Sequence, residues 1–122
     1  MNTENPFGEI IFSYTRAQAI EDGVLVDLSQ IESIRRHWKF PFACTAAVWE
    51  VIDTAVQVDG NDLEGVLHDI TLIAQIGIKL GPKADIIRID LTIGAKREQL
   101  KLHIGPGDTP EPVITLMMED ED

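Results

Sequence analysis

Three short stretches near the C-terminus decide the fold, because an apolar residue stands at every second position of each stretch. They read Ile87-Arg88-Ile89-Asp90-Leu91-Thr92-Ile93, Leu100-Lys101-Leu102-His103-Ile104 and Ile114-Thr115-Leu116-Met117-Met118. Alternation at period two is typical of strands that bury one face. A hairpin link at 94–98 and a longer, glycine- and proline-rich link at 105–112 join them. Consecutive strands with such short links predict an antiparallel meander.

The first two thirds of the chain predict helices that cover the apolar face of this meander. Apolar residues recur at steps of three and four in the two longest segments, which favours amphipathic helices. Residues 24–28 predict a short extended piece that can add a fourth strand at an edge. Helices are expected at residues 16–21, 30–37, 43–58 and 63–78.

Capping residues support these assignments. Thr15 can cap the first helix and Gly23 can end it. Ser29 stands three positions before Glu32, the spacing of a capping box. Together, the strand alternation, the helical spacing and the capping residues predict one α+β domain over residues 1–118. Its helices pack on one face of a three- to four-stranded, mainly antiparallel sheet.

Composition narrows the classes of function. The 122 residues carry a formal net charge of −11, which disfavours binding to nucleic-acid phosphates or to an anionic membrane surface. No apolar run approaches the ~20 residues of a membrane span, and the first residues lack a secretory signal pattern. A single cysteine, Cys44, excludes an intrachain disulfide and a cysteine-built metal site. We therefore expect a cytoplasmic protein.

The charge is unevenly distributed along the chain. Residues 79–101 hold six basic residues, Lys83 among them, against three acidic ones. The last four residues, 119–122, are all acidic. A terminal run of like charges repels itself, so we expect an acidic, frayed tail there.

Few residues point to catalysis. The three histidines, His37, His68 and His103, fall in three different predicted elements, whereas a catalytic metal usually needs three protein ligands. Cys44 lies on the apolar stripe of its predicted helix, where a thiol behaves as a small hydrophobe. Neither a nucleophile elbow nor a phosphate-binding glycine motif occurs. We expect no catalytic residue, no metal and no cofactor.

Two dense polar segments remain as candidates for a binding site. In residues 14–23, Arg16 has the planar fork that suits carboxylates and other anions. In residues 105–108, two glycines allow close backbone approach to a ligand. Arg16, Asp22, His103 and Asp108 are the four candidate binding residues, in a site between the 14–23 helix and the 105–108 loop. The alternative is structural: a capped helix and a rigid strand connection.

A third segment mixes cations with an aromatic ring. Residues 35–39 read Arg-Arg-His-Trp-Lys, which can stack a nucleobase, although the footprint is small in so acidic a chain. A helix end favours the same cations, and this interpretation is preferred. Trp38 and Trp49 are expected to anchor helix packing.

The chain also resembles a known family at both ends. Residues 14–27, Tyr-Thr-Arg-Ala-Gln-Ala-Ile-Glu-Asp-Gly-Val-Leu-Val-Asp, and residues 105–115, Gly-Pro-Gly-Asp-Thr-Pro-Glu-Pro-Val-Ile-Thr, are similar to the opening and ending of a family of small proteins with a domain of unknown function. Bacterial plasmids and phages carry that family. The resemblance includes the aromatic-Pro-x-x-x-Thr-x-x-x-Trp stretch at 40–49 and implies a mobile genetic element as the setting. It transfers no catalytic residue, and Tyr14-Thr15 stands where that family has a serine before the arginine.

Three hypotheses of function follow. The first is a non-enzymatic accessory or inhibitor protein that binds a host protein through its acidic surface. The second is a small ligand-binding domain or enzyme that uses the 14–23 and 105–108 site. The third is a structural orphan domain whose polar segments serve folding. The oligomeric state stays open, since an exposed strand edge invites pairing.

Overall fold

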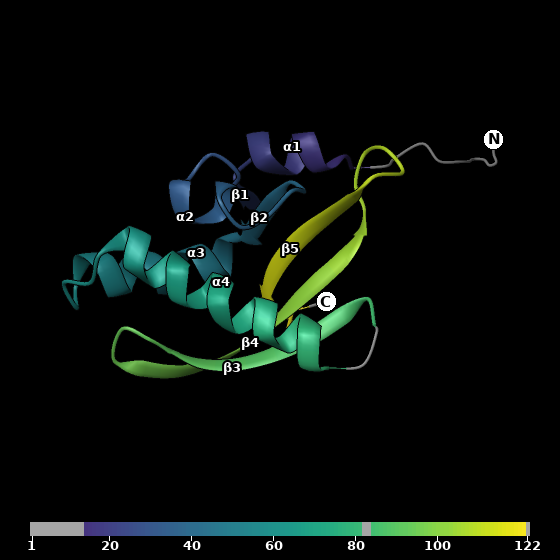
Figure 1. The fold of residues 1–122 in the computed structure, drawn as a ribbon. Coiled ribbons are helices and arrows are strands. Elements are labelled where there is room, and N and C mark those ends of the chain that lie inside the picture. Colours follow the sequence, from purple (N-terminus) through teal and green to yellow (C-terminus); the bar gives the residue numbers. More distant parts are fainter. Residues whose placement is uncertain (1–13, 82–83, 122) are drawn as a thin grey trace.

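The computed structural model describes residues 14–81 and 84–121, so residues 1–13, Pro82, Lys83 and Asp122 lie outside it. The strands form a single sheet, and the helices lie against it (Figure 1). Their order is α1 (Arg16–Glu21), β1 (Leu25–Asp27), α2 (Glu32–Arg35), β2 (Phe42–Thr45), α3 (Ala46–Gln57), α4 (Leu63–Leu80), β3 (Ile86–Ile93), β4 (Lys96–Pro106) and β5 (Pro112–Met118).

The five strands form one sheet in the order β1-β2-β5-β4-β3. All neighbours are antiparallel except β2 and β5, which are parallel. The α+β class and the C-terminal meander β3-β4-β5 are confirmed, and β1 is the expected edge strand. The sheet has one strand more than the upper number predicted, because β2 joins β1 to the meander.

The alternation in the meander has the expected physical cause. Every second residue of β3 from Ile89 to Ile93 is buried, as are Leu100 and Leu102 of β4. The hairpin link is only two residues long, since Ile93 already pairs with Lys96. Gly94 takes φ +63° there, and a Cβ at this position would lie 2.3 Å from a carboxylate oxygen of Asp59. The exposed Asp59 side chain can move aside, but the same Cβ would lie 3.0 Å from the Ala55 Cβ, so glycine is favoured by the turn and by this close approach.

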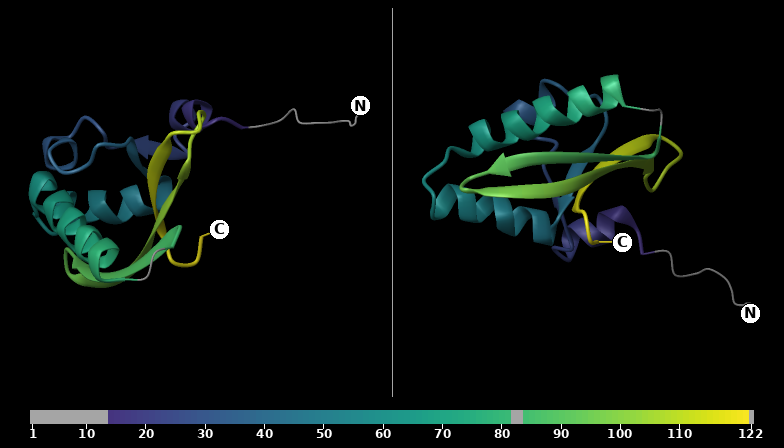
Figure 2. Two further views of the ribbon diagram at one scale, coloured as in Figure 1. Left: turned by 45° about the vertical axis from the view of Figure 1, so that its right-hand side comes forward. Right: turned by 90° about the horizontal axis from the view of Figure 1, so that it is seen from below.

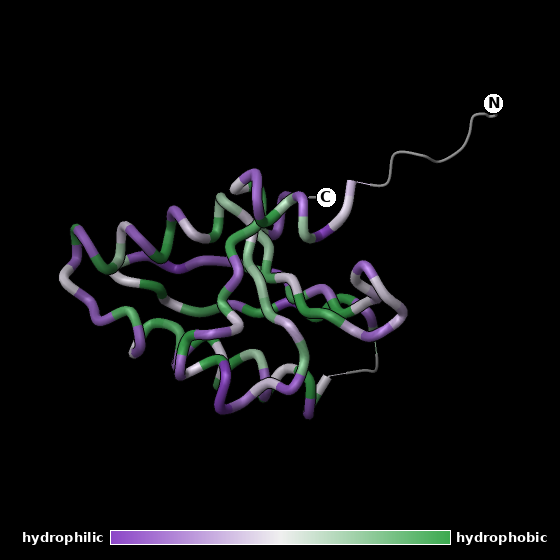
Figure 3. The backbone as a smooth tube through the Cα atoms, turned by 90° about the horizontal axis from the view of Figure 1, so that it is seen from above, coloured by the Kyte–Doolittle hydropathy of each residue, from purple (hydrophilic) through white to green (hydrophobic). Residues whose placement is uncertain are grey.

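Helices α3 and α4 cover the apolar face of the sheet, and α2 packs on α4 (Figure 2). Each long helix begins at a capping side chain: Thr45 accepts from the Val48 amide and Asp62 from the Gly65 amide. Apolar and polar segments alternate along both helices, as partly buried helices require (Figure 3). Helix α1 departs from this layer and lies beside β1.

Strand β2 corrects the sequence prediction of a helix from residue 43. All four of its residues are buried, and it pairs with β1 on one side and β5 on the other. Ala43, Cys44, Ala47 and Val48 are spaced as on a helix face, so the local pattern allows both structures. The two strand neighbours decide between them, and the helix begins only at Ala46.

Two further expectations differ from the structure. Ser29 does not cap α2, because its hydroxyl accepts from the Phe42 amide instead, and Ile31 is the N-cap without a side-chain bond. The acidic tail is not frayed at residues 119–121. Glu119 contacts Arg88, and the Glu121 carboxylate accepts from the Thr45 hydroxyl and the Met118 amide. These bonds offset the mutual repulsion of the carboxylates.

Cys44 gives a test of the burial of β2. Its side chain is fully buried in the core, and burial raises the pKa of the thiol from 9.0 to about 12. At pH 8 this leaves a thiolate fraction about a thousandfold smaller than at the ordinary value. We expect Cys44 to stay unreactive toward a thiol reagent in the folded protein and to react at once in urea. A Val58→Cys variant supplies the control, since Val58 is 75% exposed and its thiol should react quickly. Rapid labelling of Cys44 in the native protein would contradict the assignment.

Candidate functional site

Asp108 and α1 lie together, as the proposed binding site requires. The Asp108 carboxylate accepts from the backbone amides of Arg16 (Oδ1, 2.7 Å) and Ala17 (Oδ2, 3.1 Å). At the same helix start, Thr15 and Gln18 form a capping box. Asp108 thus satisfies amide groups that have no partner within the helix, and a carboxylate is favourable at this end of the helix dipole. The 107–111 loop therefore holds α1 in place.

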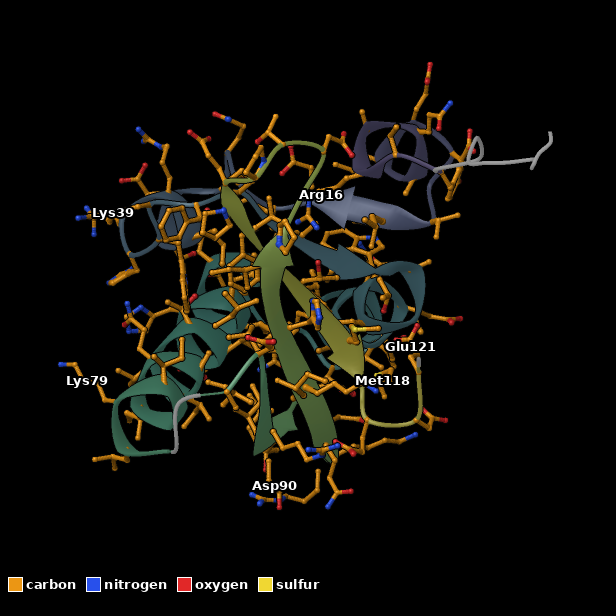
Figure 4. All side chains as sticks on the ribbon, turned by 90° about the vertical axis from the view of Figure 1, so that its right-hand side faces the viewer. Arg16, Lys39, Lys79, Asp90, Met118 and Glu121 are labelled. Carbon is orange, nitrogen blue, oxygen red and sulfur yellow. The ribbon has the colours of Figure 1, made fainter. Side chains whose placement is uncertain are left out.

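The Arg16 side chain points from α1 to the sheet (Figure 4). Its guanidinium donates to the Thr115 hydroxyl (2.7 Å) and to the Ile114 carbonyl oxygen (2.8 Å). Thr115 alternates with buried residues of β5, so this contact lies on the sheet face opposite α3 and α4. Burial lowers the pKa of Arg16, and the nearby carboxylates of Asp27 and Asp108 oppose that shift. The donors of Arg16 are thus used within the fold.

Asp22 lies at the other end of α1, away from Asp108. Its carboxylate accepts from the Tyr14 hydroxyl at 2.7 Å, and this hydrogen bond raises the pKa of Tyr14. Asp22 is also the C-cap residue of α1. Asp22 therefore links the C-terminal end of α1 to Tyr14, which precedes the helix.

His103 is exposed on the sheet face that carries Thr115, its partner across β4 and β5. Its ring lies over Gly105, where a Cβ would be 3.1 Å from Cε1. Among the described residues no hydrogen bond joins His103 to the other three candidates. The structure therefore joins Arg16 to Asp108 by a hydrogen bond, places His103 opposite the Thr115 that accepts from Arg16, and places Asp22 at the other end of α1.

A groove between α2 and the start of α4 was not predicted. It has a volume of ≈ 830 Å³ and its wall includes Ser33, His37, Glu64 and His68. The Ser33 hydroxyl donates to the Glu64 carboxylate, which also accepts from the Ser33 amide at 3.1 Å. The His37 and His68 rings meet edge to face with centroids 5.8 Å apart. One signal was present: Ser33 and His37, and likewise Glu64 and His68, stand four residues apart, which places each pair on one helix face.

Carboxylates dominate the rim of this groove. Glu32, Asp62 and Asp69 also line it, against the single guanidinium of Arg36. Hydrogen bonds from Arg35, and more weakly from Arg36, lower the pKa of Glu32 and keep it ionised. In the described part of the chain no three potential ligands are grouped to hold a metal ion. The arrangement suits a cationic group.

Residues 35–39 form the predicted helix end. The Trp38 ring packs against Phe42 with centroids 5.1 Å apart, and the His37 carbonyl accepts from the Gln75 side chain at 3.2 Å. Trp38 and Trp49 are partly buried against the core, as expected. Trp38 therefore helps to attach α2 to the core.

Comparisons with known proteins add no relative. No family model, curated protein or solved structure matches this chain. The resemblance to plasmid and phage proteins stays a prediction. Among residues 14–81 and 84–121, no helix is both long and apolar enough to cross a membrane.

The Asp108 contacts predict a structural effect of mutation. Asp108→Ala removes the acceptors for two helix amides and should lower the free energy of unfolding by about 1–2 kcal/mol. Glu111→Ala is the control, because Glu111 is exposed in the same loop. Urea unfolding measures the stability, and amide exchange should be faster in α1 of the Asp108 variant alone. Equal stability of the two variants would refute the role given to Asp108.

Proposed function

We propose that this chain is a non-enzymatic accessory protein of the bacterial cytoplasm that binds a host protein through a carboxylate-rich helical layer. One observation carries this proposal. Residues 40–78 contain no Lys or Arg, and all six of their acidic residues are exposed on or between α3 and α4: Glu50, Asp53, Asp59, Asp62, Glu64 and Asp69. We call these six the acidic layer.

The acidic layer determines the kind of partner. Grouped carboxylates on one side of a protein attract a basic surface and accelerate association with it. A basic cleft that normally holds nucleic-acid phosphates is such a surface, so the acidic layer would compete with nucleic acid for it. An inhibitor of this kind suits a mobile genetic element, the setting that the family resemblance implies.

The groove between α2 and α4 is a specific site at which a basic partner can contact the acidic layer. Its rim contains three residues of the acidic layer, Asp62, Glu64 and Asp69, together with Glu32. A Lys or Arg side chain of the partner can enter and meet several carboxylates at once. Because a side chain is partly desolvated in a groove, its ion pairs gain more than pairs on an open surface.

The contacts of α1 favour this proposal over a ligand site at residues 14–23 and 105–108. Arg16, Asp22 and Asp108 all have partners within the chain, so a ligand would have to displace those bonds. They agree with the structural interpretation of these segments. Within the acidic layer, Asp62 and Glu64 accept from Gly65 and Ser33. Among the described residues, no hydrogen bond or ion pair is found for the other four side chains, which leaves them available to a partner.

A pair of charge-matched variants tests the proposal. The layer variant carries Glu50→Gln, Asp53→Asn, Asp59→Asn and Asp69→Asn. The control carries Glu21→Gln, Asp85→Asn, Glu111→Gln and Asp120→Asn, which are exposed residues outside the layer. Both variants lose four negative charges and keep the residues that cap helices. Affinity capture from bacterial lysate at low and at high salt then compares them with the unmodified protein.

We expect the unmodified protein and the control to retain the same basic protein at low salt and to lose it at high salt. The layer variant should retain at least tenfold less. Equal losses in both variants would show a response to overall charge, which contradicts a specific layer. Recovery of no salt-sensitive protein would also contradict the proposal.

A further inference from the structure

The outer edge of β3 is an unpaired strand edge. Among the described residues β3 pairs only with β4. The Ile104 amide donates to the Asp85 carbonyl oxygen at 2.8 Å, so odd-numbered residues direct their backbone groups toward β4. Backbone groups alternate in direction along an antiparallel strand. The amides and carbonyls of residues 86, 88, 90 and 92 therefore point outward and can accept another strand.

Helix α4 borders this edge with exposed apolar side chains. It runs along β3 so closely that a Cβ on Gly77 would lie 3.1 Å from Ile87. A shallow depression of ≈ 260 Å³ beside the edge is lined by both α4 and β3, with Leu72 and Thr92 among its residues. Leu72, Ile76 and Leu80 are 48%, 45% and 83% exposed, and their spacing of four places them in one strip. Leu72 joins the strip to the edge, and Leu72 and Ile76 also line a second depression beside Trp38.

The charges on this edge are complementary to themselves. Arg88 and Asp90 both point to the open face and both are exposed. If a second β3 pairs antiparallel with Ile89 opposite Ile89, then Arg88 of each strand faces Asp90 of the other. A shift by one pair in either direction places Arg88 opposite Arg88 or Asp90 opposite Asp90. Opposite charges across strands stabilise and like charges destabilise, so one register is selected.

We propose that a second copy of this chain occupies the edge, and that two sheets join through β3 into a symmetric dimer. The outward amides and carbonyls pair across the twofold axis, and the strip on α4 is brought to the contact. The surface is self-complementary, which a twofold interface requires.

Electrostatics across the molecule favour this contact. Two chains of net charge −11 repel each other least where basic residues gather. The β3-β4 hairpin carries Arg88, Lys96 and Arg97, and Asp69 is the member of the acidic layer that lines the depression beside this edge. Within one chain Arg88 pairs with Glu119 and Asp90 with Arg97, each at 2.9 Å. Exposed pairs of this kind are weak, so they exchange readily for pairs across the edge.

Sedimentation of the full chain tests the dimer. At submillimolar concentration we expect a species of twice the 13.6 kDa chain mass. Arg88→Asp places two carboxylates opposite each other and should raise the dimer dissociation constant at least tenfold. The double variant Arg88→Asp/Asp90→Arg restores opposite charges and should restore the dimer. Lys39→Asp makes the same charge change at an exposed residue outside the hairpin and should leave the dimer intact.

A fourth variant addresses the backbone. Thr92→Pro removes an outward amide that has no partner in the single chain, so the fold should persist while the dimer weakens. Circular dichroism checks the fold of each variant. A chain that stays monomeric at submillimolar concentration would overturn the proposal. A dimer that survives Arg88→Asp, or that the double variant fails to restore, would also overturn it, since the association would then use another surface.

Discussion

The pairing of β2 with β5 is the constraint on which the rest of the structure depends. Among the described strands it is the only parallel contact, and it joins residues 42–44 to residues 114–116. The Ile114 amide donates to the Pro41 carbonyl oxygen at 2.9 Å. The carbonyl oxygen of the same Ile114 accepts from the Arg16 guanidinium. Without this contact the meander and the first half of the chain would be two small pieces, each with too little core to be stable alone. The fold is one domain because this contact forms.

The same contact gives the sheet two different faces. Helix α3 begins directly after β2, so the pairing places α3 and α4 over the apolar face and turns their carboxylates outward. On the opposite face, Arg16 from the start of the chain and Glu121 from its end each bond to a central strand (Figure 4). The polar groups of that face hold the chain together. The carboxylates of the helical layer are exposed, which is why we propose that a partner binds there.

The sequence predicts an element well when the local pattern permits one structure only. The alternation at 87–93 and the Thr15 cap of α1 are such cases, and both assignments are confirmed. Strand β2 is not such a case. Three apolar residues and Thr45 stand next to a helix and extend its pattern, and only neighbours distant in sequence make them a strand. The candidate site divides in the same way. Arg16 and Asp108 lie in the two polar segments that the sequence singles out. Their contact joins residues 92 positions apart, so it depends on how the strands pair in the sheet. The groove at Ser33 and Glu64 depends on the packing of two helices, which no local pattern reports.

The central claim is that residues 42–45 form a strand beside β5. Nuclear Overhauser effects between backbone protons measure this directly in the labelled full chain. Pairing of β2 with β5 predicts long-range contacts between the backbone protons of residues 42–44 and 114–116, and extended-strand chemical shifts at Ala43 and Cys44. Helical shifts from Ala43 onward, with no contacts to residues 114–116, would contradict it.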